Sequence, residues 1–203
     1  MPVRIFIIHL YFYMDVAIAG EYYLEGLREM ASGFLFRPDG SFEFFFTYGA
    51  MDRFGSGRWV EKNGQLNLTS RPKPPYDFAL VESKSHPHDF INIKLESANP
   101  ALLPHVFCSL QNAAEGSWKQ MNQQGDVQFH KQPVESVSLI LEFCPERFST
   151  IPVSHKDHNE FTFRFEQSIM EVFFDNLLLQ VEPYGLSGHH PLMEGEIFRY
   201  AKK

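Results

Sequence analysis

The sequence predicts an all-β protein in which the N- and C-terminal segments form an antiparallel barrel and the middle forms an additional small β-sandwich. Short runs of alternating apolar residues and turn dipeptides at hairpin spacing indicate strands, and no window of a dozen residues shows a convincing 3.6-residue apolar period. The 203-residue chain is 44% hydrophobic, enough for one large β domain or two smaller ones. Its 21 phenylalanines suit strands and β interiors.

The clearest predicted strand is Ser41–Tyr48. Side chains of an extended chain alternate in direction, so Glu43 and Thr47 are expected to face solvent while the aromatic residues share the buried face. Those aromatic residues are Phe42, Phe44, Phe46 and Tyr48. Before this run, Pro38-Asp39-Gly40 supplies a fixed φ, an Asx side chain and a glycine free to take positive φ. A hairpin turn followed by a half-buried antiparallel strand is therefore predicted.

Further strand candidates are short and separated by turn residues. They are Tyr76–Glu82, Phe90–Leu95, His105–Leu110, Val127–His130, Val137–Phe143, Phe148–Val153, Glu160–Glu166, Met170–Phe174, Leu177–Glu182 and Glu196–Tyr200. Arg71–Pro75 cannot donate most ladder hydrogen bonds, so it marks a corner or linker. The expected organisation is a barrel from residues 20–82 and 160–203, closed so that no sheet edge is exposed, with residues 83–159 as an inserted or packed sandwich.

Several short motifs carry a resemblance to known proteins. Gly20-Glu21-Tyr22 opens a strand, Ser32–Phe42 forms a hairpin, Gly57-Arg58-Trp59 lies in the next strand, and Gly195–Tyr200 ends the last one. With these motifs, Gly20–Ser70 and Phe161–Tyr200 resemble small bacterial lipocalin-like β-barrel proteins. Asn122–Phe129, an N-x-x-G-D-V-x-F segment, resembles the transthyretin-like, carboxypeptidase-regulatory type of β-sandwich.

The lipocalin-like resemblance implies a particular packing at one end of the barrel. In lipocalins the opening aromatic residue packs under an arginine from the end of the barrel, which implies contact between Tyr22 and Arg199. Tyr22 stands where lipocalins have tryptophan, and Trp59 is the alternative partner of the arginine.

The barrel interior is the leading candidate site. An eight-stranded barrel is just wide enough to be filled by its own side chains or to hold one small apolar ligand, and bulky phenylalanines favour the filled case. The ligand-binding candidates are Phe34, Phe36, Phe42, Phe44, Phe46, Tyr48, Trp59, Phe161, Phe163 and Arg199. The leading hypothesis is a non-catalytic module that binds a small apolar ligand. The alternatives are an envelope protein–protein interaction or structural module and, second, a histidine-dependent metal-binding protein or hydrolase.

Composition narrows the classes of partner and the location. A net charge of −7 without a Lys/Arg cluster argues against nucleic acid and anionic membrane as partners. A signal peptide over residues 1–19 is indicated by Arg4, the apolar run Ile5–Tyr13 and Ala17-Ile18-Ala19. This segment predicts a periplasmic or secreted protein. A true start at Met14 is the alternative and predicts a cytoplasmic one. The run is too short to span a bilayer, so no membrane insertion is expected.

Three loops combine histidines with each other or with carboxylates. His86-Pro87-His88-Asp89, His155-Lys156-Asp157-His158 and His189-His190 all lie in polar turn segments without the ligand spacing of a known metal site. No bound metal is expected. The weaker metal candidates are His86, His88, His155 and His158.

No catalytic residue or cofactor is expected. The sequence lacks a G-x-S-x-G elbow, an H-E-x-x-H motif, a P-loop and a dinucleotide-binding glycine motif. Cys108 and Cys144 form no C-x-x-C pair, and either a disulfide or two buried thiols fits their apolar surroundings. An enzyme is therefore disfavoured and survives only if the histidine loops converge.

Overall fold

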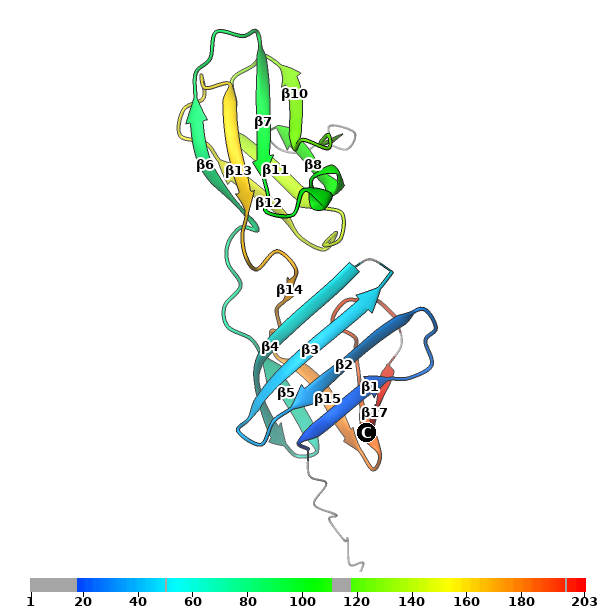
Figure 1. The fold of residues 1–203 in the computed structure, drawn as a ribbon. Coiled ribbons are helices and arrows are strands. Elements are labelled where there is room, and N and C mark those ends of the chain that lie inside the picture. The colour runs from blue at the N-terminus through cyan, green and yellow to red at the C-terminus, as the bar shows by residue number, and fades with distance from the viewer. Residues whose placement is uncertain (1–17, 50, 111–117, 196) are drawn as a thin grey trace, which may run out of the picture.

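The computed structural model describes residues 18–49, 51–110, 118–195 and 197–203, and it confirms the predicted all-β class. Eight antiparallel strands close a barrel, and two four-stranded sheets form a second lobe beside one end of it (Figure 1). Most of the predicted signal segment, Met1–Ala17, lies outside the described residues. Among the described residues, no helix has the length and apolar character needed to cross a membrane.

The barrel strands pair with their neighbours in order, as in an up-and-down barrel. They are β1 (Gly20–Leu24), β2 (Met30–Phe36), β3 (Ser41–Tyr48), β4 (Met51–Lys62), β5 (Gln65–Thr69), β15 (Leu177–Glu182), β16 (Gly185–Gly188) and β17 (Phe198–Lys202). β5 pairs with β15, and β17 pairs with β1 to close the ring. β14 (Glu171–Val172) adds a short parallel pairing to β4. The chain therefore leaves the barrel after β5 and re-enters it at β15.

The turn between β2 and β3 has the predicted form. Gly40 has a φ of +80°, and its N–H donates to the Arg37 carbonyl over 3.1 Å. The Asp39 carboxylate accepts hydrogen bonds from both the hydroxyl and the backbone N–H of Ser41. These hydrogen bonds lower the pKa of Asp39, because they favour its charged form.

Strand β3 has the predicted register over its length except at its last residue. Phe42, Phe44 and Phe46 are between 1% and 5% exposed, and Glu43 is exposed. Tyr48, in contrast, is 49% exposed. It pairs with Met51 where β3 turns into β4, so strand alternation alone cannot bury it.

The second lobe contains more of the chain than predicted. One sheet has the order β10 (Asp126–His130), β7 (Phe90–Glu96), β13 (Glu160–Phe165) and β6 (Phe78–Lys84). The other has β12 (Phe148–Pro152), β11 (Ser136–Leu141), β8 (Val106–Leu110) and β9 (Lys119–Gln120). A 3₁₀ helix, η1 (Pro100–His105), precedes β8. Buried residues of both sheets form one hydrophobic core, so the lobe is a sandwich.

The expected domain boundary and two ligand candidates need correction. β6 and β13 were expected in the barrel, but β13 pairs with β6 on one side and with β7 on the other. Phe161 and Phe163 are therefore fully buried in the sandwich core and do not line the barrel. The assignment was wrong because the alternation of apolar residues reveals which side chains share a face of a strand, but it does not reveal which strand pairs with it.

Two buried arginines join the lobes. Arg53 of β4 is 3% exposed and donates to the carbonyls of Phe143 and Met170, each over 3.1 Å, and to the Glu146 carboxylate over 2.7 Å. Arg147 donates to backbone carbonyls of residues 168–171 and lies 3.1 Å from the Asp77 carboxylate. Charge-assisted hydrogen bonds therefore connect the chain segments at the junction between the barrel and the sandwich, which we call the neck.

The two cysteines are free and buried, which decides between the two alternatives for them. Cys108 lies in the sandwich core. The Cys144 thiol donates to the Ile169 carbonyl over 3.1 Å, and burial raises its pKa to about 11. Neither thiol is available as a nucleophile at neutral pH.

The register of β3 gives a first testable prediction. Phe44→Ala should lower the free energy of unfolding by about 3–5 kcal/mol, because it removes a ring from a packed core. Glu43→Lys, one residue away, breaks only an exposed ion pair with Arg37 and should cost less than about 1 kcal/mol. Urea denaturation at fixed pH measures both values. Equal losses in the two variants would contradict the register.

Candidate functional site

The barrel interior is filled by aromatic side chains. The Phe34 ring centroid lies 5.0 Å from that of Phe44 and 5.1 Å from that of Tyr200. Phe174, from the segment that re-enters the barrel, lies 5.0 Å from Phe42 and 5.4 Å from Phe44. These are contact distances for aromatic rings. Of the two alternatives for the interior, the packing therefore favours the self-filled one.

Glycines in β4 make room for this packing. A Cβ placed on Gly55 would lie 2.7 Å from the Phe174 ring, and one on Gly57 would lie 2.8 Å from the Phe42 ring. Such distances are too short for a real Cβ, so the rings occupy the space that the missing side chains leave. The two glycines of β4 thus serve the packing of phenylalanines.

Trp59 and Arg199 are the remaining interior candidates. Trp59 is half-buried, packs edge-on against Phe36 at 5.9 Å and donates from its indole nitrogen to the Arg37 carbonyl. Arg199 is exposed on β17, and Lys202 takes its expected place, with Nζ 5.6 Å from the centroid of the Tyr22 ring. The implied Tyr22–Arg199 pair is therefore corrected: in β17, residues 200 and 202 share the face opposite to residue 199.

His190 is a buried polar group inside the aromatic core. It is 5% exposed, and its ring lies 5.4–5.8 Å from those of Phe44, Phe46 and Phe198. Its Nδ1 accepts a hydrogen bond from the Leu192 backbone N–H, and its Nε2 lies 3.0 Å from the Ser32 hydroxyl. Burial lowers the pKa of His190 to about 4, so the imidazole is neutral at pH 7.

The hydrogen bonds around His190 assign its tautomer and exclude a role for it as the base that activates Ser32. Because Nδ1 is an acceptor, the proton is on Nε2, which donates to Ser32. The Ser32 hydroxyl in turn donates to the Phe45 carbonyl over 3.0 Å. A base that activates serine must accept the hydroxyl proton, and this imidazole donates instead. Ser32 and His190 therefore form a structural hydrogen-bond chain.

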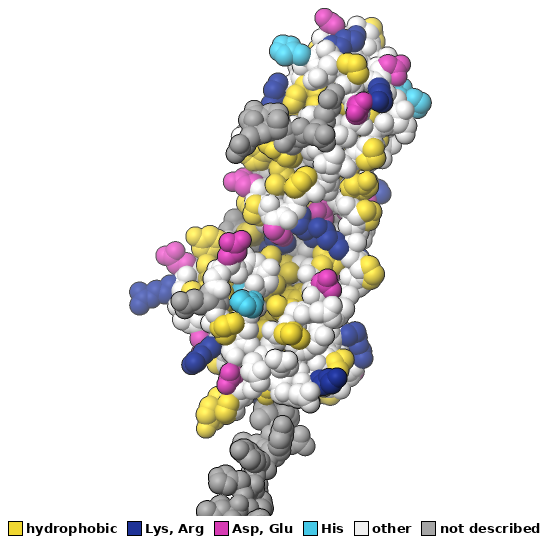
Figure 2. Space-filling view, turned by 180° about the vertical axis from the view of Figure 1, so that it is seen from behind, with side chains coloured by type: hydrophobic (Ala, Val, Ile, Leu, Met, Phe, Trp, Pro, Cys, Tyr) yellow, Lys and Arg dark blue, Asp and Glu magenta, His cyan; other side chains and the backbone are white. Residues whose placement is uncertain are grey.

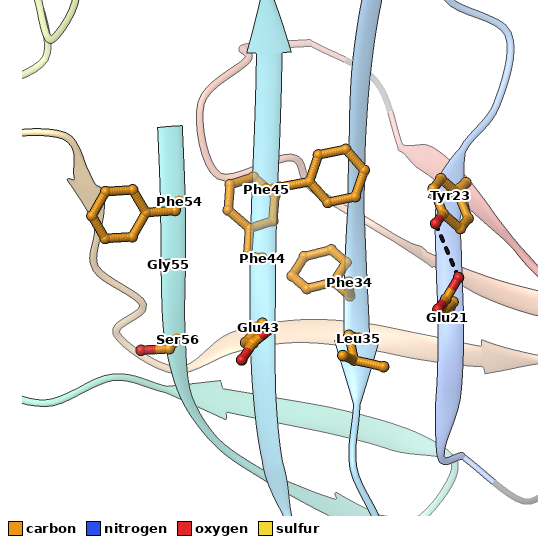
Figure 3. A pocket seen from close by; sticks show the side chains of 10 residues that line it. All are labelled: Glu21, Tyr23, Phe34, Leu35, Glu43, Phe44, Phe45, Phe54, Gly55 and Ser56. Carbon is orange, nitrogen blue, oxygen red and sulfur yellow. Dashed lines mark hydrogen bonds between the residues drawn. The ribbon is translucent and has the colours of Figure 1, made fainter. Parts of the chain in front are cut away.

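A hollow of about 550 Å³ lies on the outer surface of the barrel over β1–β4 (Figure 3). Two rows of paired residues build it: Tyr23, Gly33, Phe45 and Phe54 in one row, and Glu21, Leu35, Glu43 and Ser56 in the next. Phe34 and Phe44 contribute to the lining from the interior side. The sequence analysis missed this site, although Phe45 on the polar face of a predicted strand was a usable signal.

Gly33 shapes the floor of the hollow. A Cβ on Gly33 would lie 2.9 Å from the Phe45 ring, so the ring lies over the glycine. The Tyr23 and Phe45 rings meet across it at 5.9 Å and 62°. Phe54, the next residue in this row, is 52% exposed. The hollow thus presents aromatic surface to solvent.

The charged residues that line the hollow are both acidic. Its lining includes the carboxylates of Glu21 and Glu43 and no lysine or arginine. Glu43 is already paired with Arg37 at 2.9 Å, whereas Glu21 accepts a hydrogen bond from the Tyr23 hydroxyl. The C-terminal Lys203 lies with Nζ 4.5 Å from the Tyr23 ring centroid. The aromatic surface therefore accepts a cation from the chain itself.

The histidine loops between β6 and β7 and between β12 and β13 meet at one end of the sandwich. His158 lies 3.0 Å from the hydroxyl of Ser83, and Asn159 hydrogen-bonds the backbone of residues 86–90. His189, in contrast, is an exposed neighbour of His190 in the other lobe. Two of the three histidine loops thus converge.

Comparison of the chain with protein-family models, with curated proteins and with solved structures gives no match.

The buried His190 gives a pH-dependence prediction. The folded state lowers its pKa from about 6.5 to about 4, so the stability it contributes is fully present above pH 6.5 and is lost as the pH falls toward 4. Wild type should lose about 3 kcal/mol more than His190→Asn between pH 7 and pH 4, measured by urea denaturation. The neighbouring exposed control, His189→Asn, should keep the wild-type slope. An unchanged slope in His190→Asn would show that another group carries this dependence.

Proposed function

We propose that the protein is a non-catalytic binding module whose barrel binds a small ligand in its outer hollow. The ligand would combine an aromatic or aliphatic body with a cationic group. The observation that carries this proposal is the row Tyr23–Gly33–Phe45–Phe54, which exposes aromatic rings beside two carboxylates on the outside of a filled barrel.

The size and chemistry of the hollow support such a ligand. Its volume of about 550 Å³ falls within the roughly 300–1,000 Å³ of small-molecule sites. Aromatic faces attract cations, and the Lys203 ammonium group over Tyr23 shows that contact within the chain. Glu21 adds a carboxylate that has no cationic partner among the residues lining the hollow.

The proposal moves the predicted ligand from the inside of the barrel to the outside. Lipocalin barrels hold a ligand inside, whereas in this chain Phe174 and the glycines of β4 leave the interior to protein rings. The resemblance to lipocalin-like proteins stays a prediction. A filled interior also suits the interaction-module alternative, which the binding experiment separates from this proposal.

The test is a ligand titration followed by NMR chemical shifts. Phenethylamine should bind the wild-type protein at millimolar concentrations, and 3-phenylpropionate, which carries the opposite charge, should bind more weakly. Phe54→Ala should weaken phenethylamine binding about fivefold, because one exposed aromatic contact is worth about 1 kcal/mol. Glu21→Gln should reduce the preference for the cation.

A matched control keeps this test specific. Phe148→Ala removes a ring that is 64% exposed on the sandwich, and it should leave phenethylamine binding unchanged. Equal weakening by both phenylalanine substitutions would argue for unspecific binding. If neither compound binds the wild type, the small-ligand proposal fails and the interaction-module alternative replaces it.

A further inference from the structure

A second candidate site lies at the end of the sandwich away from the barrel, where Figure 2 shows histidine side chains. His86 and His88 come from the loop between β6 and β7, and Glu160 begins β13. One ligand atom from each of these residues lies within 4.8 Å of the others. Imidazole nitrogen and carboxylate oxygen are ligands of zinc and related ions.

A buried asparagine holds the loop that carries both histidines. Asn159 is 3% exposed, and its side-chain oxygen accepts a hydrogen bond from the His86 N–H over 2.7 Å. Its amide nitrogen lies 3.1 Å from each of three backbone carbonyls, those of His86, His88 and Phe90. A single buried side chain thus fixes the loop beside the strand that supplies the carboxylate.

The surroundings of His88 prepare one of its nitrogens to bind a metal. Its ring stacks on Phe90 at 3.9 Å, and its Nδ1 lies 2.9 Å from the Phe90 carbonyl. The amide nitrogen of Asn159 lies 3.0 Å from the same Nδ1, but its two protons already face three carbonyls. We therefore assign the Phe90 carbonyl as the partner of Nδ1, which places the proton on that nitrogen. That arrangement leaves the lone pair of Nε2 free. A backbone carbonyl behind the ring is the usual orienting partner of a metal-binding histidine.

Strand register places the third ligand. Glu160 pairs with Lys84 of β6 and with Asn92 of β7, the two strands that flank the histidine loop. Lys84 Nζ lies 3.9 Å from the Glu160 carboxylate, a loose contact at an exposed site. A metal ion bound by His86 and His88 would compete with Lys84 for the Glu160 carboxylate.

We propose that His86, His88 and Glu160 bind a divalent transition-metal ion, with zinc as the representative ion. Ligands of a tetrahedral zinc lie about 3.4 Å apart, as follows from Zn–N and Zn–O bonds of about 2.1 Å. The exposed His86 supplies the short movement that closes the site. Solvent takes the fourth position. No metal was expected because the histidine loops lack the ligand spacing of a known site, whereas Glu160 reaches the two histidines from a different segment of the chain.

The neighbouring cluster is the weaker candidate and the natural control. His155, Asp157 and His158 also place ligand atoms within 4.8 Å of one another. All three lie in one turn closed by a hydrogen bond from the His158 N–H to the His155 carbonyl, and two of them are exposed. His158 also contacts Ser83 through its Nδ1. Among the residues that the structure describes, none from a second strand joins this cluster.

The experiment is calorimetric titration of the tag-free, chelator-treated full chain with zinc chloride. The wild type should bind one equivalent. Replacing His86 and His88 together by asparagine should weaken binding by about a hundredfold or more, since losing outer partners alone costs about 10–100-fold. Glu160→Gln should weaken it by at least about tenfold. Circular dichroism and thermal denaturation without metal check that each variant is folded.

Replacing His155 and His158 together by asparagine is the matched control and should keep the wild-type affinity. The proposal is overturned if the wild type takes up no zinc, or if the His86/His88 variant binds it as well as the wild type. Loss of binding only in the His155/His158 variant would likewise overturn it and assign the metal to the turn. Should the His86/His88 variant not fold, Glu160→Gln decides, and unchanged affinity in that variant refutes the three-ligand site.

Discussion

The barrel depends on a hydrogen-bonded clasp at the neck of the insertion. Ser70, where the chain leaves the barrel, donates from its N–H to the Phe174 carbonyl over 2.9 Å, and Phe174 donates from its N–H to the Ser70 hydroxyl oxygen over 3.1 Å. That hydroxyl also donates to the Ser56 carbonyl in β4. With exit and entry points held together, β5 and β15 can pair across the long insertion and close the ring. Without this pairing, both strands would present open edges.

The same clasp determines what the barrel can bind. By fixing Phe174 at the mouth, it directs the ring onto Phe42 and Phe44, in the space left by Gly55 and Gly57. The interior then resembles a protein core, in which there is little free volume for a ligand. Exposed aromatic surface remains on the outer face of β1–β4, because Gly33 lets Phe45 lie flat between Tyr23 and Phe54. Closure of the barrel thus explains why the candidate ligand site is on its outside.

The sequence predicted most strands correctly because apolar alternation and turn residues are local signals. Ser41–Tyr48 and Leu177–Glu182 have the predicted bounds, and Gly40 has the predicted positive φ. Strand partners are a non-local property, so β13 was assigned to the wrong lobe, and Phe161 and Phe163 with it. The candidate sites show the same difference between local signals, which the sequence contains, and non-local contacts, which it does not reveal. The histidines of both loops were visible in the sequence, but the role of Asn159 depends on contact between segments about 70 residues apart.

Asp77 and Arg147 form a buried ion pair near the junction of the two lobes. A gain in folding stability is not the main contribution of this pair. Burial raises the pKa of Asp77, and the neighbouring Arg147 opposes that shift, so desolvation outweighs attraction for this carboxylate. The Asp77 backbone N–H donates a hydrogen bond to the Ser149 hydroxyl oxygen over 2.8 Å. A hydrophobic pair would fill the same volume at less cost, but it would not discriminate between orientations. Arg53 and Arg147 favour one arrangement of sandwich and barrel, because both are buried and another arrangement would remove the carbonyl and carboxylate partners that they contact across the junction.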